Sequence, residues 1–157
     1  MKHAFILLWP HGFQYNEQIF TKIAEKYKII YHNSFKINNL ENFVMSLYVN
    51  ENLEHIKNKN KFLLTNNKNG QIYVYIFQNE ENDIELYGNT LKSKGVEDLK
   101  IYLRNLYNPK LPNPNQRIIP LKRGVSHNHI IHSSDLSREV PEFCKMLNIN
   151  YEVFNNN

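Results

Sequence analysis

The stretch AFILLWP, Ala4 to Pro10, sets the fold of this chain. Five consecutive apolar residues that end at Trp-Pro are typical of a central strand buried on both faces. Apolar residues at helical spacing predict a helix at 16–27 and another at 39–49, with a strand at 27–37 between them. The run at 61–78, interrupted by the turn-forming residues NNKNG, predicts a β-hairpin, and 83–88 predicts an edge strand.

The second half of the chain continues this alternation. The segment 96–107 predicts an amphipathic helix with inward-facing Leu99, Tyr102, Leu103 and Leu106. A proline-rich loop at 108–124, a short strand at 128–132 and a helix at 134–147 follow. The order indicates an α+β fold, a ferredoxin-like split βαβ sandwich with a mainly antiparallel sheet and helices on one face.

Length and composition indicate one domain without membrane or nucleic-acid partners. The 157 residues suffice for a single domain at 1–150, and we expect 151–157 to be a frayed tail. A net charge of +4 is too small to indicate nucleic acid as a partner. The single cysteine, Cys144, excludes an intramolecular disulfide framework. Since no apolar stretch has the length of a signal peptide or a membrane span, we expect a cytoplasmic location.

The stretch SHNHIIHSSD, residues 126–135, holds three of the seven histidines. His127 and His129 alternate along the predicted strand and lie on one of its faces. Together with His132 they have a spacing that a zinc-dependent hydrolase would use. In a regular strand, however, His132 points away from His129, so we predict no metal site.

Three short motifs resemble those of nucleoside diphosphate kinases. FILLWPHG is similar to that family's first strand followed by Lys-Pro-Asp-Gly, and NPNQRIIPLKRG is similar to its Asn-Pro and Arg-Gly loop. HIIHSSD is similar to its Asn-Ile-Ile-His-Gly-Ser-Asp motif, which carries a phosphoryl-accepting histidine. The family's lysine and aspartate in the first motif are replaced by Trp9 and His11, and the asparagine in the third by His129.

The resemblance implies roles for individual residues. His132 would be the nucleophile, and Ser134 would follow it in the motif. The predicted ligands of phosphate or nucleotide are His11, Tyr48, Arg104, Lys122, Arg123 and His129. From its place on the last predicted helix, Glu142 could orient the imidazole, and Glu139 is the alternative. The family's activity also implies Mg²⁺ bound with the nucleotide, and a homo-oligomer.

Three hypotheses follow for the function. The first is a divergent nucleoside diphosphate kinase-like phosphotransferase, which acts on a nucleotide or phosphorylated small molecule through a phosphohistidine. The second is a non-catalytic nucleotide- or phosphate-binding module of the same fold. The Leu-Trp-Pro turn of this chain also resembles the turn of proteins linked to surface-polysaccharide synthesis. The third is a metal-dependent hydrolase built on the histidine cluster.

Overall fold

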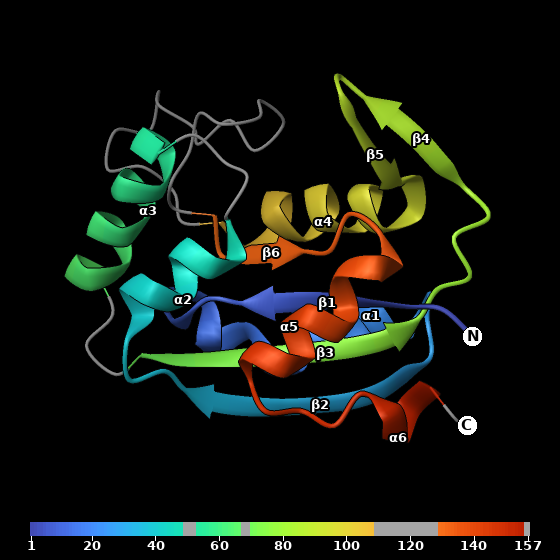
Figure 1. The fold of residues 1–157 in the computed structure, drawn as a ribbon, viewed down its shortest axis with the longest axis horizontal. Helices are drawn as coiled ribbons and strands as arrows, with labels where there is room; N and C mark the ends of the chain where they lie inside the picture. Colours follow the sequence, from blue (N-terminus) through green and yellow to red (C-terminus); the bar gives the residue numbers. More distant parts are fainter. Residues whose placement is uncertain (49–52, 67–69, 109–128, 156–157) are drawn as a thin grey trace.

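A four-stranded antiparallel sheet forms the centre of the computed structural model, which describes residues 1–48, 53–66, 70–108 and 129–155. The strand order is β2 (Ile29–Lys36), β3 (Gln71–Gln78), β1 (His3–Leu8) and β6 (Ile131–Ser133). Figure 1 shows β1 between β3 and β6. All six residues of β1 are buried, which confirms the predicted central strand.

Two crossover helices cover one face of this sheet. α1 (Asn16–Ala24) connects β1 to β2, and α4 (Lys94–Tyr107) precedes β6. Their buried residues, which include Ile19, Ile23 and Leu99, pack with the even-numbered residues of β1. The result is the predicted α+β sandwich.

The opposite face is also covered by helices, which corrects the expectation of helices on one face only. α2 (Leu40–Leu47), α3 (Leu53–Asn66) and α5 (Val140–Met146) bury apolar residues against the odd-numbered residues of β1. Figure 1 shows α2 and α5 in front of the sheet and α1 behind it. Phe5 stacks on Phe143 of α5, with ring centroids 3.6 Å apart. Because β1 is apolar at every position, both of its faces need a cover.

The predicted hairpin at 61–78 is wrong in its first half. The segment 61–65 belongs to α3, whose buried residues Ile56, Lys59, Asn60 and Leu63 recur at helical spacing. A hairpin forms later instead, from β4 (Ile84–Tyr87) and β5 (Thr90–Ser93), and it projects beyond α4 (Figure 1).

Two further predictions are corrected at the surface. Tyr102 and Leu106 of α4 are 42% and 48% exposed rather than inward-facing, because Val96, Leu99 and Leu103 already supply its apolar stripe. The last predicted helix begins later than residue 134. A 3₁₀ helix at Ser137–Glu139 comes first, and α5 starts at Val140.

The C-terminal segment is not frayed over its described part. It forms α6 (Glu152–Asn155), and Tyr151 and Phe154 pack against the core. The Tyr151 hydroxyl lies 2.9 Å from His3 Nδ1, which ties the segment to β1. No helix in the described ranges has both the length and the apolar character of a membrane span.

The turn WPHG, residues 9–12, holds the chain segment that leads into β6. Trp9 N donates to the carbonyl oxygen of Ile130 at 2.7 Å. A 3₁₀ helix at Pro10–Tyr15 follows, and a Cβ on Gly12 would lie only 2.9 Å from Ile130 Cβ. Only glycine allows this close approach, so the turn holds the chain in place two residues before His132.

Candidate active site

His132 lies in β6 opposite Leu7 of β1. Its ring is on the side of the sheet that α2 and α5 cover, and it is partly exposed. Tyr48, at the end of α2, meets it edge-on with ring centroids 4.8 Å apart, and Phe5 lies at 5.9 Å. The structure thus brings together two predicted site residues, His132 and Tyr48.

Four cationic side chains from three elements surround this histidine. Lys59 comes from α3, Lys92 from β5, and Lys100 and Arg104 from α4. The three lysines are only 3%, 9% and 7% exposed, in that order. We call these four residues the basic cluster. Buried cations need a counter-charge, and Glu97 and Asp135 supply part of it.

Glu97 is the carboxylate at the centre of the basic cluster. Its Oε2 lies 2.7 Å from Lys100 Nζ and 3.4 Å from Lys92 Nζ. Lys92 Nζ also lies 3.4 Å from Asp135 Oδ1. Burial raises the pKa of Glu97, but the two lysines more than offset this effect, and the net pKa falls below its usual value. Glu97 is therefore ionised at neutral pH.

The environment keeps His132 uncharged. Burial lowers its pKa well below 6.5, and the positive charges of Lys100, Arg104, Lys59 and Lys92 lower it further. Its imidazole is therefore neutral at pH 7, which is the nucleophilic form. Burial also lowers the pKa of Lys100 to about 8, helped by Arg104 and Lys92.

Lys59 lies beside Trp9, which occupies the position of the lysine in the resembled family's motif. Its Nζ lies 5.1 Å from the Trp9 ring centroid and donates to the carbonyl oxygen of His129 at 3.1 Å. Burial lowers its pKa well below 10.5, and Arg104 adds to the effect. Lys59 is not among the site residues predicted from the sequence. Its spacing from Ile56 and Leu63 was the available signal, because it places a lysine on the buried stripe of α3.

Arg104 is fixed beside β6. Its Nη2 donates to the carbonyl oxygen of Ile131 at 3.0 Å. Its Nε is buried and has no hydrogen-bond partner among the described residues. A guanidinium that is partly satisfied in this way can still donate to an anion.

The predicted residues after His132 have distinct contacts. Ser134 is 2% exposed, and its Oγ accepts a hydrogen bond from Phe5 N at 3.0 Å, which extends the pairing of β6 with β1. Glu139 Oε2 accepts from the backbone N–H groups of Asp135 and Leu136 at 2.9 and 2.7 Å, so it caps the 3₁₀ helix. Glu142 is exposed and lines the same cavity as His132.

The remaining predicted residues lie at the edge of the site or outside the described ranges. His129 is buried, with Nδ1 2.9 Å from Asn108 Nδ2. The His11 ring contacts Phe62 of α3, with centroids 5.0 Å apart. Lys122, Arg123 and His127 lie outside the described residues. Within the described ranges, no group of three or more His, Cys, Asp or Glu could hold a metal ion.

A cavity of about 630 Å³ opens beside His132. It lies between the end of α2, the turn of the β4–β5 hairpin, the 3₁₀ helix before α5, and α5 itself. Its size is that of a small-molecule site. Cys144 takes no part in it: this thiol is buried in the core, and burial raises its pKa to about 11.

Comparisons with known proteins agree with the fold. No model of a known protein family matches the sequence, and no curated protein matches it. The chain is similar to the nucleoside diphosphate kinase of Encephalitozoon cuniculi, with 14% identity, 96% of this chain and 91% of that chain covered, and a TM-score of 0.55. It is also similar to a nucleoside diphosphate kinase family protein from Babesia bovis, with 15% identity, 92% and 86% covered, and a TM-score of 0.52. The chain has a nucleoside diphosphate kinase-like fold.

Proposed function

We propose that this protein is a phosphotransferase that takes the terminal phosphoryl group of a nucleoside triphosphate onto His132. One observation carries the proposal: the imidazole of His132 lines an open cavity and lies beside the buried basic cluster, and burial together with the charges of this cluster lowers its pKa. An imidazole attacks phosphorus only in its unprotonated form, and the group being transferred must meet cations. The site meets both requirements at one residue.

The transfer step balances without a further reactant. The lone pair of one His132 nitrogen attacks the γ-phosphorus, and a nitrogen–phosphorus bond forms. The bond between this phosphorus and the bridging oxygen breaks, and its electron pair leaves with the nucleoside diphosphate. The phosphoimidazole then holds the group for a second substrate. The tyrosine ring of Tyr48 limits the orientations open to the imidazole.

The basic cluster would stabilise the charge of the phosphoryl group. In this proposal Lys59 takes over the task of the family's lysine, because it reaches the surface of Trp9 from α3. Arg104 supplies its free Nε. Lys122 and Arg123, which lie outside the described residues, remain proposed as further phosphate ligands. Phosphoryl transfer depends mostly on such positioned charges.

Mg²⁺ would arrive with the nucleotide. The carboxylates beside the basic cluster are already engaged, since Glu97 pairs with two lysines and Asp135 pairs with Lys92. The described residues therefore offer no set of oxygen ligands for a resident ion. We infer that the phosphates of the nucleotide would hold the ion, which would supply part of the charge neutralisation there.

A non-catalytic binding module is the second candidate. The ion pairs of Glu97 and the bond from Arg104 to the Ile131 carbonyl favour it, because they hold the cations in place without any substrate. Such a module would bind nucleotide or phosphate at the basic cluster and form no covalent bond to His132. Labelling of the protein separates the two functions.

The deciding experiment uses γ-³²P-labelled ATP and GTP with Mg²⁺. We expect protein-bound label that is lost in acid and retained in base, and that is absent from His132→Asn. His32→Asn, at an exposed histidine of β2, is the matched control and should label normally. The loading rate should stay level from pH 7 down to about 6, because His132 is already neutral there and Lys100 is charged. Nucleotide binding without any label would overturn the phosphotransferase proposal and leave the binding module.

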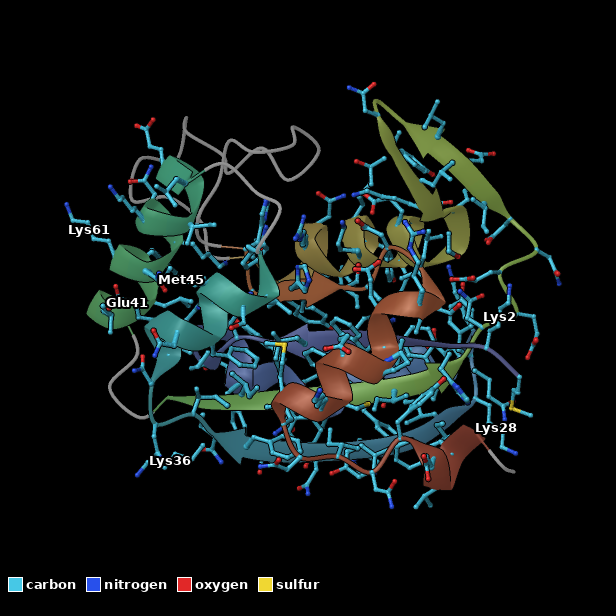
Figure 2. All side chains as sticks on the ribbon, viewed as in Figure 1. Lys2, Lys28, Lys36, Glu41, Met45 and Lys61 are labelled. Carbon is cyan, nitrogen blue, oxygen red and sulfur yellow. The ribbon has the colours of Figure 1, made fainter. Side chains whose placement is uncertain are left out.

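A second pair of variants tests the role of Lys59. Lys59→Met should slow loading by about 10- to 100-fold, the effect of losing one charge-assisted hydrogen bond. Lys61→Met is the control, since Lys61 projects from the outer side of the same helix (Figure 2). Thermal unfolding of both variants shows whether a loss of loading is a loss of folding. Equal loading by the two variants would remove Lys59 from the site.

A further inference from the structure

His132 lies at a boundary between regions of opposite charge. On one side is the basic cluster, with Glu97 as its central carboxylate. On the other side is the cavity, whose ionisable lining, apart from His132, consists of Asp135, Arg138, Glu139 and Glu142. Three carboxylates and one guanidinium give this lining a formal charge of −2, and Lys92 offsets the charge of Asp135 from outside the lining. The two sides of the imidazole are therefore suited to different ligands.

The carboxylates of the cavity differ in how far they are engaged. Asp135 pairs with Lys92, and Glu139 accepts two backbone hydrogen bonds. Glu142 has no ion pair among the described residues and is exposed on α5. Glu142 is thus the lining carboxylate that is available to a bound molecule.

The rest of the lining suits an uncharged polar molecule. Ser46, Asn89 and Thr90 supply hydroxyl and amide groups that both donate and accept hydrogen bonds. Phe5 and Leu91 supply apolar surface. A nucleoside diphosphate, which carries several negative charges, would meet the carboxylate of Glu142 here, and like charges repel one another.

We propose that this cavity binds the phosphoryl acceptor, and that the acceptor is a neutral molecule with several hydroxyl groups rather than a second nucleotide. This inference rests on the proposed function, because His132 is the source of the phosphoryl group. A hydroxyl oxygen of the acceptor attacks the phosphorus, and a phosphorus–oxygen bond forms. The nitrogen–phosphorus bond breaks, and its electron pair returns to the imidazole. Glu142 takes the hydroxyl proton, and a phosphate monoester leaves.

The first test is a chase of labelled protein that has been freed of nucleotide. The chase panel contains free sugars, sugar alcohols and nucleosides in one arm and nucleoside diphosphates in the other. We expect label to move to a neutral acceptor, and loaded Glu142→Gln to transfer its label about 100-fold more slowly than the loaded parent protein. Glu41→Gln, on the outer side of α2, is the control (Figure 2). Transfer to nucleoside diphosphates alone, at the same rate in Glu142→Gln, would overturn the inference.

The second test needs no phosphorylation. The same panel is titrated against unlabelled protein, and binding is followed by calorimetry. A neutral polyhydroxylated compound should bind, and Thr90→Trp, which fills the cavity from the hairpin turn, should abolish this binding while nucleotide binding at the basic cluster persists. If neutral compounds bind in this way but no label ever loads, the phosphotransfer proposal fails and the binding site stands. If no neutral compound binds, the site is refuted.

Discussion

Helix α4 buries two neighbouring stripes of side chains that differ in kind. Val96, Leu99 and Leu103 recur every three or four residues and pack against the sheet. Glu97, Lys100 and Arg104 repeat the same spacing one residue later and face the basic cluster around His132. A single helix therefore builds both the core and the candidate site.

The two stripes have different physical effects. Burial of the apolar stripe stabilises the fold in proportion to the area removed from water. Burial of the charged stripe is unfavourable unless its charges pair well, and apolar side chains of the same size often stabilise a protein as well or better. Under the proposed function the charged stripe serves to bind an anion rather than to stabilise the fold, and four changes test this difference.

The largest effect is expected at Glu97. Glu97→Gln removes the central carboxylate of the basic cluster and leaves buried lysines without their partner, which should reduce the free energy of unfolding by about 3–5 kcal/mol. Tripolyphosphate should restore part of the loss, since it supplies the missing negative charge. Urea unfolding with and without tripolyphosphate measures both. A variant that is destabilised equally in both conditions would argue against an anion site.

A change in the apolar stripe should reduce stability without altering the effect of the anion. Leu99→Ala leaves a cavity in the core and should lower the free energy of unfolding by about 3 kcal/mol. Because Leu99 faces away from the basic cluster, tripolyphosphate should shift the unfolding midpoint of this variant as much as that of the parent protein. Loss of that shift would show that the two stripes are not independent.

Lys100 should make anion binding depend on pH. With a pKa of about 8, it loses its charge above that value, so tripolyphosphate affinity should fall by up to about tenfold per pH unit between pH 8 and 9.5. The ligand-free protein should gain stability in the same range, because the unfolded chain still binds that proton. Lys100→Arg, whose guanidinium stays charged, should flatten the affinity profile. A profile unchanged by this substitution would assign the pH dependence elsewhere.

The smallest effect is expected at the exposed ion pair of α4. Lys94 Nζ and Asp98 Oδ2 lie 2.5 Å apart, but both side chains are about half exposed. Water and salt screen such a pair, so Asp98→Asn should leave the unfolding midpoint and the loading rate unchanged. A measurable loss of either would mean that α4 is sensitive to charge along its whole length.

The sequence predicted much of the fold and the residue at the centre of the site. The apolar run at Ala4–Leu8 predicted the central strand, and the resemblance of HIIHSSD to a family motif marked His132 as a candidate nucleophile. The spacing of an apolar stripe can be recognised in the sequence because it involves only residues that are close together along the chain. The interpretation failed at 61–65, where a short apolar run fits a strand or a helix equally well.

What only the tertiary structure decided is which charges lie together. Lys59, Lys92 and Arg104 come from three separate elements, and no spacing along the chain indicates that they surround one histidine. The sequence showed that Trp9 replaces a lysine, and the structure showed Lys59 against its indole. Burial and charge act through space, so the lowered pKa of His132 comes from its burial and from the way α3, β5 and α4 bring their cations to it.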